Sequence, residues 1–245
     1  MTMTMEYLQW LLRFSGDARF GDAIERMTFN TAMGARKKDD RAIAYMSSPN
    51  QLAATLTSSK YGWHDYYEAY APNHNACCCP ANSVRLWPEY VRQAILKKGN
   101  DYRIQLYGPM KMKDGDVEIG MYTAYPFDNR IEIHVKNLKG KLEFRRPDWA
   151  DDMKVVANKP GSKYVVTFAC KPVVRSWSDR TGGKDRMKSV EYGPLVFVQP
   201  VEEKWTPCVQ PTNCEQLPPD WKGFEVTPAK KPVAKTCAAK KCAAK

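Results

Sequence analysis

The chain has 245 residues, 43% of them apolar, and a formal net charge of +11. Such a chain can bury a core in one large or two modest domains. No apolar run approaches the roughly 20 residues of a membrane-spanning helix, and eight cysteines are too few for a disulfide scaffold. The opening MTMTMEYLQWLLRF has no positively charged leader, so it does not indicate a signal peptide, and no compartment is predicted.

The first segment, residues 5–36, has the spacing of two helices. SGD at 15–17 interrupts the pattern, and either Ser15 or Asp17 can cap the second helix. The apolar positions at helical spacing are Leu8, Leu11 and Leu12 before the break, and Phe20, Ile24, Met27 and Thr31 after it.

The middle segment, residues 37–75, has no regular period and many aromatic side chains. Three adjacent cysteines and Pro80 follow in NHNACCCPANSVR. The stretch SVRLWPEYVRQAILKKGN then predicts a helix that starts or kinks near Pro88 and ends at Gly99-Asn100.

From Tyr102 onward the period changes to two. In RIEIHVKNL the apolar Ile131, Ile133 and Val135 alternate with polar residues, as on a strand with one buried face. Further strand-like runs are separated by the turn sequences DGD, PFDN, LKG and KPGS. Many short strands separated by turns predict an antiparallel β-sandwich.

The last segment, TPAKKPVAKTCAAKKCAAK, contains six lysines and no acidic residue. We predict a disordered basic tail over residues 228–245. Such a tail attracts polyanions without specificity. Because the basic residues are not interleaved with aromatics on a strand platform, we predict no specific nucleic-acid partner.

The thiols Cys77, Cys78 and Cys79 are candidates for a metal site or a nucleophile, because a thiolate serves as both. Zinc usually takes four ligands, and the nearest further candidates are His64 and His74. The alternative is a tight structural turn with buried thiols. Spacing alone leaves both interpretations open.

Three carboxylates are candidates for a functional role, and two of them suit a sugar site. Asp65 and Glu68 lie among aromatics in GWHDYYEAY, a mixture that suits sugar hydroxyls and ring faces, although a loop packed by its own aromatics gives the same pattern. Glu25 lies within a predicted helix in DAIERMTFN. It follows Ile24 and could therefore sit at the edge of the buried face, although a helical Glu beside Arg26 is also typical of a solvated surface.

Several stretches together resemble glycoside hydrolase family 127, the β-L-arabinofuranosidases. SGDARFGDAIERMTFN is similar to a GDARYADVLERALYN helix of the family, and ACCCPANSVRL is similar to its CCPPNxxR motif. TAYPFDNRIEIHV, FRRPDWA and SVEYGPLVFV resemble the TDYPWDGxVxxxV, LRIPGWA and AVxxGPLVYA stretches. The resemblance runs in order from about residue 5 to residue 203.

The resemblance implies an α+β multidomain protein: the C-terminal part of an (α/α)6 barrel, then an antiparallel β-sandwich, then the basic tail. It implies a retaining glycoside hydrolase with Cys78 as nucleophile and Cys78 and Cys79 as zinc ligands. Glu25 and Tyr45 match positions that resemble substrate-pocket residues, and Asn82 and Arg85 are interpreted as supports of the turn. The implied substrate is an arabinose-containing oligosaccharide or glycan.

In the family, a Glu-x-Cys pair completing the zinc site and the acid/base Glu lie before the stretch that starts here at Met5. We therefore expect a C-terminal fragment that is weakly active or inactive alone and is completed by a separately encoded N-terminal half. The expected domains are residues 1–100 (partial barrel), 101–205 (sandwich), 206–227 (loop) and 228–245 (tail). The alternatives are a carbohydrate-binding or assembly module and a zinc or redox thiol protein. We expect no membrane partner.

Overall fold

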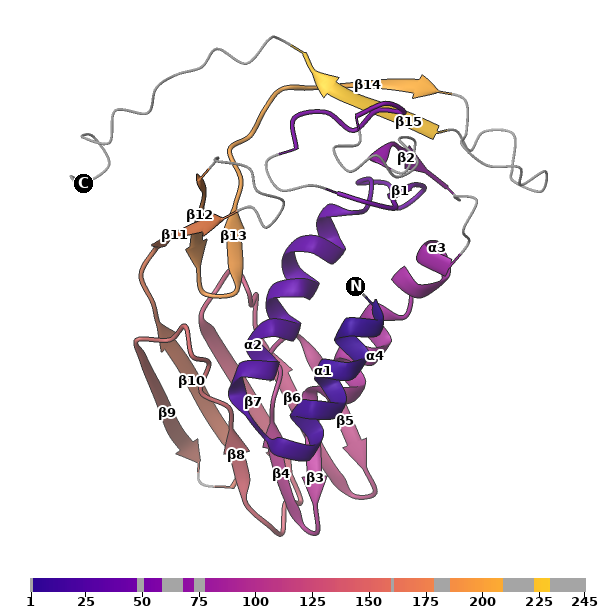
Figure 1. Cartoon of the computed structure of the whole chain (residues 1–245). Coiled ribbons are helices and arrows are strands. Elements are labelled where there is room, and N and C mark those ends of the chain that lie inside the picture. Colours follow the sequence, from indigo (N-terminus) through magenta and orange to yellow (C-terminus); the bar gives the residue numbers. More distant parts are fainter. Residues whose placement is uncertain are drawn as a thin grey trace. The chain divides into compact units, whose positions relative to one another are not determined.

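The computed structural model describes residues 2–47, 51–58, 68–72, 78–159, 161–178, 186–208 and 223–229 (Figure 1). The described part is mostly β-sheet with a few helices. It divides into two compact units. The first joins Met1–Arg36 to Ala76–Val198, and the second joins Lys37–Asn75 to Gln199–Lys245. None of the described helices is long and apolar enough to cross a membrane.

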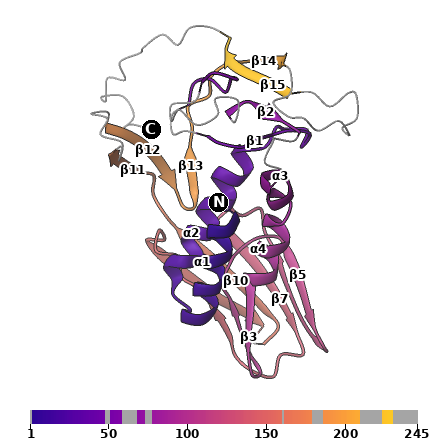
Figure 2. The same ribbon diagram turned by 45° about the vertical axis from the view of Figure 1, so that its right-hand side comes forward.

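The helices of the first unit lie beside one another, on one side of its sheets (Figures 1 and 2). The helical segments at residues 2–15, 18–32 and 86–94 share a core that includes Met5, Leu12, Ile24 and Tyr90. The helices are α1 (Thr2–Ser15), α2 (Ala18–Arg26) with the π-helical continuation η1 (Met27–Ala32), α3 (Cys78–Ser83) and α4 (Leu86–Ala94).

The break between the first two helices is confirmed. Gly16 has φ +67°, a conformation that glycine adopts without steric cost. Asp17 is the N-cap of α2, and its side chain accepts a hydrogen bond from the Arg19 backbone N–H at 2.9 Å.

Three sheets complete the first unit. A five-stranded sheet has the order β5-β6-β7-β10-β9, a second has the order β3-β4-β8, and a third has the order β11-β12-β13. The strands are β3 (Ile95–Lys98), β4 (Asp101–Ile104), β5 (Met110–Asp114), β6 (Val117–Tyr122), β7 (Arg130–Lys136), β8 (Leu142–Phe144), β9 (Asp152–Lys159), β10 (Lys163–Ala169), β11 (Val173–Ser178), β12 (Arg186–Tyr192) and β13 (Leu195–Phe197).

The first two sheets share one hydrophobic core. The alternation predicted for RIEIHVK is confirmed, since Ile131, Ile133 and Val135 are buried in β7. They join Ile104 of β4 and Val166 of β10 in the same cluster. Alternate residues of these strands therefore face one another across a common interior.

The helix predicted through Lys98 is wrong beyond Ala94. Residues 95–98 form strand β3, which pairs with β4 in the register Ile95↔Ile104 and Lys98↔Asp101. Gly99, with φ +61°, lies in the turn between them. The pairing with β4 overrides the helical spacing of the sequence.

The sheets are not purely antiparallel, contrary to expectation. Strands β4 and β8 pair in parallel, with Tyr102 opposite Leu142 and Ile104 opposite Phe144. Between them the chain passes through three strands of the larger sheet, so β8 returns to β4 running in the same direction.

The second unit contains one four-stranded sheet of order β1-β2-β15-β14. Two of its strands overlap the segment expected to be a loop, one by half and the other almost entirely, and they pair antiparallel from Glu203↔Pro228 to Cys208↔Gly223. The rest of that loop and the basic tail beyond Ala229 lie outside the described residues. The strands are β1 (Ile43–Ala44), β2 (Tyr70–Ala71), β14 (Glu203–Cys208) and β15 (Gly223–Pro228).

Candidate active site

The short helix α3 begins within the cysteine cluster, at Cys78. The side chain of Cys79 is partly exposed and forms no disulfide. Cys77 and the side chain of Cys78 lie outside the described residues. The structure therefore places the backbone of the predicted nucleophile at the start of a helix, and its chemical role stays a prediction.

The motif residues that follow the cysteines contact each other. The Asn82 carbonyl accepts the backbone N–H of Arg85 at 3.2 Å, and the Asn82 side-chain oxygen accepts Nη1 of Arg85 at 3.3 Å. Arg85 also lies 3.9 Å from the carboxylate of Glu6 on α1. These contacts tie the end of α3 to α1.

The described side chains offer few metal donors. Among them, no group of three or more His, Cys, Asp or Glu residues lies close enough to hold a metal ion. Of the predicted zinc ligands, only Cys79 has a described side chain, and the further candidates His64 and His74 lie outside the described residues. The zinc site stays a prediction.

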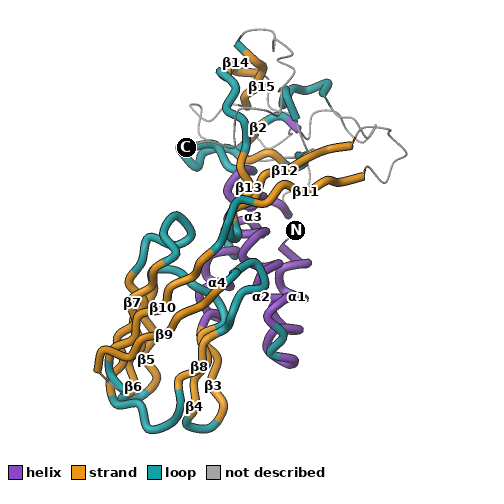
Figure 3. The backbone as a smooth tube through the Cα atoms, turned by 90° about the vertical axis from the view of Figure 1, so that its left-hand side faces the viewer, coloured by secondary structure: helices purple, strands orange, loops and turns teal. Residues whose placement is uncertain are grey.

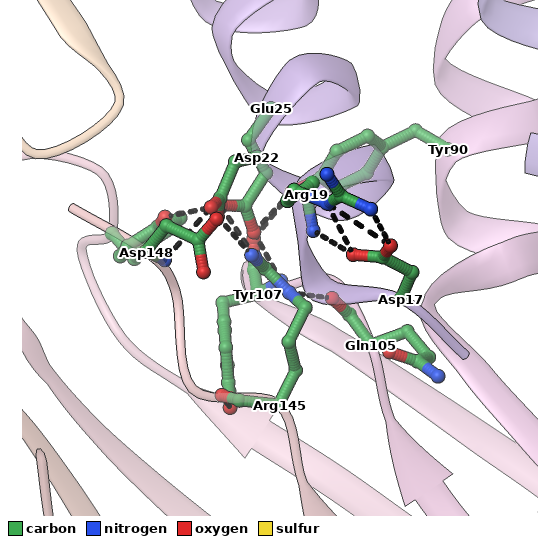
Figure 4. A network of polar contacts seen from close by, with 10 residues as sticks. Asp17, Arg19, Asp22, Glu25, Tyr90, Gln105, Tyr107, Arg145 and Asp148 are labelled. Carbon is green, nitrogen blue, oxygen red and sulfur yellow. Dashed lines mark hydrogen bonds and ion pairs between the residues drawn. The ribbon is translucent and has the colours of Figure 1, made fainter. Parts of the chain in front are cut away.

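Glu25 lies at the centre of a buried polar network rather than on a surface (Figure 4). Its Oε1 accepts the backbone N–H of Tyr107 at 3.1 Å, with the Tyr90 hydroxyl at 3.5 Å. Its Oε2 accepts the Tyr125 hydroxyl at 2.7 Å and lies 2.6 Å from Nη2 of Arg145. The carboxylate on α2 is thus surrounded by partners from α4 and the loops next to the sheets.

Arg145 is the cation of this network, and its side chain is fully buried. Besides Glu25 it pairs through Nη1 with Asp22, and its Nε donates to the carbonyl of Gln105. The second oxygen of Asp22 accepts the backbone N–H of Asp148 at 2.8 Å. One guanidinium therefore holds two carboxylates that lie three residues apart on one face of α2.

Gly21 makes room for that guanidinium. A Cβ at this position would lie 2.7 Å from Nε and 2.8 Å from Cδ of Arg145. The helix approaches the arginine so closely that no side chain fits between them.

The ionisation of the network follows from its burial and its charges. Burial, and then the Glu25 carboxylate, raise the pKa of Tyr90 and Tyr125 well above their ordinary value, so both phenols remain donors. Burial alone would lower the pKa of Arg145, but Glu25 and Asp22 raise it. Burial raises the pKa of Asp22, and Arg145 opposes that shift.

The same helical segment also contacts the third sheet. Arg26 of α2 lies 2.6 Å from Glu191 of β12. Asn30 of η1 donates to the Pro194 carbonyl at 2.8 Å and accepts the Val196 backbone N–H at 2.7 Å. The helical segment with the sequence DAIERMTFN therefore has two anchors. Near its start it contacts Arg145, and near its end it contacts the third sheet.

The other sugar-site candidates belong to the second unit. Tyr45 is half-buried just after β1. Glu68 is buried and accepts the Ser58 hydroxyl at 2.8 Å and the Gln51 amide at 3.3 Å. Asp65 lies outside the described residues. The substrate-binding roles of Glu25 and Tyr45 stay predictions.

Sequence reasoning missed Arg145 and Gly21. A signal was present, because Asp22 and Glu25 lie one helical turn apart beside a glycine in GDAIE. Two carboxylates on one helical face predict a shared cation, but no local feature of FRRPDWA distinguishes Arg145 from Arg146 as that cation.

Comparison with known proteins gives one family match and several related folds. Residues 2–92 match the model of the GH127 catalytic domain of β-L-arabinofuranosidases. A GH127 β-L-arabinofuranosidase from Geobacillus stearothermophilus T6 superposes with a TM-score of 0.59 at 17% identity, over 91% of this chain and 46% of that one. No curated protein sequence matches.

Two further solved structures resemble the chain. A glycoside hydrolase has a TM-score of 0.57 at 15% identity, over 91% of this chain and 48% of its own. A GH127 β-arabinofuranosidase has a TM-score of 0.52 at 20% identity, over 78% of this chain and 35% of its own. The chain thus spans less than half the length of each of these structures.

The family model and the solved structures agree on one resemblance, to the catalytic region of glycoside hydrolases. More particularly, the resemblance to glycoside hydrolase family 127 predicted from the motifs is confirmed, and its catalytic-domain match includes both α2 and the cysteine helix α3.

Proposed function

We propose that this chain supplies the nucleophile-bearing part of a retaining glycoside hydrolase that acts on β-L-arabinofuranosides. The match of residues 2–92 to the GH127 catalytic domain is the observation that carries this proposal. Its substrate would be an arabinose-containing oligosaccharide or glycan, because one solved relative is described as a β-L-arabinofuranosidase and another as a β-arabinofuranosidase.

In the proposed reaction, Cys78 is the catalytic residue. Its sulfur attacks the anomeric carbon, a C–S bond forms as the bond to the leaving oxygen breaks, and that oxygen takes up a proton. Water then attacks the same carbon, the C–S bond breaks, and the thiolate is regenerated. Two inversions at one carbon give net retention.

The resemblance also supports a zinc ion held by Cys78 and Cys79. When bound, zinc would keep the thiol of the nucleophile deprotonated near neutral pH. Two thiols are fewer than the four ligands that zinc usually takes, so further donors are needed. Glu25 and Tyr45 are proposed substrate-pocket residues, with Asn82 and Arg85 supporting the turn.

The resemblance assigns no general acid within these 245 residues. A positioned acid typically contributes 10²–10⁴-fold to the rate. We therefore propose that helices outside these 245 residues supply the acid and the rest of the catalytic domain. The exposed apolar face of α1 supports this part of the proposal, with exposed fractions from 40% to 80% at Tyr7, Trp10, Leu11 and Phe14.

A complementation assay tests the proposal. The purified chain is assayed on an oligosaccharide that ends in a β-L-arabinofuranosyl unit, alone and mixed with a polypeptide carrying the N-terminal helices of a GH127 catalytic domain. We expect little or no release of arabinose from the chain alone, and release from the mixture that Cys78→Ser abolishes. Equal release by the Cys78→Ser mixture would refute Cys78 as nucleophile.

A further inference from the structure

Strands β11 and β12 pair antiparallel and lie side by side (Figure 3). One face of this pair carries aromatic and polar side chains. Alternate side chains of a strand point to the same face, so Val173, Arg175 and Trp177 share one face of β11. The register places Glu191 opposite Val173 and Ser189 opposite Arg175 on that same face.

One hydrogen bond fixes the N–H edge of Trp177 on this face. Its indole Nε1 donates to the Ser189 hydroxyl at 2.7 Å. Because Ser189 pairs with Arg175 and not with Trp177, the indole reaches diagonally across to the neighbouring strand. The residue nevertheless remains 48% exposed. The indole is therefore anchored at its N–H edge while about half of its surface stays open to solvent.

Arg175 is held beside the indole by a buried carboxylate. Glu191 is 4% exposed, and its Oε2 lies 2.6 Å from Nε of Arg175. Its Oε1 lies 2.6 Å from Nη1 of Arg26 and accepts the Ser189 hydroxyl at 3.3 Å. The Arg175 side chain is 49% exposed, and within the described part of the chain its terminal nitrogens have no acceptor.

We propose that Trp177 and Arg175 form a glycan-binding platform that takes an arabinose-containing chain at a subsite separate from the cysteine helix. The half-exposed indole suits the C–H face of a sugar ring, and the half-exposed guanidinium suits its hydroxyls. The two residues are neighbours on one strand face, roughly 7 Å apart along the strand, within the span of one or two sugar units. The choice of arabinose rests on the proposed function.

Affinity electrophoresis tests the platform with the full chain in native gels that contain soluble arabinan or dextran. We expect arabinan to retard the wild type and dextran to have no effect. Trp177→Ala should weaken the apparent affinity about tenfold or more, because a rigid aromatic anchor carries much of the binding energy at such a site. Trp177→Phe, which keeps a ring but loses the bond to Ser189, should lose less.

The matched control is Val174→Ala, which changes an exposed residue on the opposite face of the same strand. Its retardation should equal that of the wild type, and circular dichroism should show every variant folded. An unretarded wild type, equal retardation by dextran, or unchanged binding by Trp177→Ala would overturn the platform. Cys78→Ser should bind arabinan normally, so failed binding and failed hydrolysis are distinguishable results.

Discussion

At the scale of single residues, the buried pair of Glu25 and Arg145 determines how α2 meets the sheets. A buried charge is stable only when it is paired and hydrogen-bonded. Both carboxylate oxygens of Glu25 have hydrogen-bond donors, and Arg145 pairs with two carboxylates. The helical spacing of the sequence indicated that Glu25 could lie at the edge of the core. Its environment depends on Tyr107 and Tyr125, far away in sequence, and local patterns do not reveal such contacts.

Replacing Arg145 by methionine should destabilise the chain strongly. The change leaves the Glu25 carboxylate buried without a cation, which typically costs about 3–5 kcal/mol. Urea denaturation of Arg145→Met measures the free energy of unfolding. Arg146→Met is the control: Arg146 is exposed and donates only to the carbonyls of Ala150 and Asp151, so its loss should cost about 1 kcal/mol or less. Similar losses in both variants would contradict this account of the network.

At the scale of elements, α2 depends on close approach at Gly21. Gly21→Ala places a methyl group against the buried Arg145 stem, and overpacking of this kind costs about 1–3 kcal/mol. Gly34→Ala is the matched control in the same helical segment, since nothing lies within 4 Å of its added Cβ. Thermal unfolding should show a lower midpoint for the first variant and an unchanged or higher midpoint for the second.

The helix α1 has apolar residues on two faces, one packed and one exposed. Met5 and Leu12 are buried, whereas Trp10 and Phe14 are 40% and 80% exposed and stack on each other with ring centroids 5.7 Å apart. A helix that is apolar on all sides is normally covered on all sides. Its sequence predicted the helix but could not show which face would remain open.

The open face of α1 should cause self-association of the isolated chain. We expect light scattering after size-exclusion chromatography to show a mass that rises with concentration, because apolar surface is exposed. Phe14→Glu should reduce that rise. Thr4→Glu, which adds the same charge at an exposed polar position of α1, should have a smaller effect. A wild type that stays monomeric at every concentration would contradict the expectation.

At the scale of the whole molecule, the order of helices followed by strands was predictable from the change of period near Tyr102. The pairing of β8 with β4 and the strand at residues 95–98 were not, because both depend on partners distant in sequence. The nucleophile and its neighbours were assigned from motifs. The domain boundaries expected at residues 100 and 205 stay predictions.

Acid should weaken the larger sheet through Glu132 on β7. Hydrogen bonds from Lys163, and then from His134, lower the pKa of Glu132 from 4.5 to about 2. A carboxyl whose pKa is lowered in the folded state stabilises the fold at pH values above its unfolded pKa. That contribution is lost as the pH falls toward the folded-state pKa. Glu132→Gln should therefore have a lower melting temperature than wild type at pH 7. The difference should shrink between pH 4.5 and pH 2, and a difference that persists at pH 2 would contradict the assignment.

The central claim, that Cys78 is a glycosyl-accepting nucleophile, is tested most directly by intact-mass measurement. The chain is incubated with 4-nitrophenyl β-L-arabinofuranoside and quenched in acid. Nitrophenolate leaves with little need for protonation, so the first step does not depend on a general acid. We predict one arabinosyl unit on the peptide that contains Cys78, with no more than one nitrophenolate released per chain. No adduct, or an adduct that persists in Cys78→Ser, would contradict the claim.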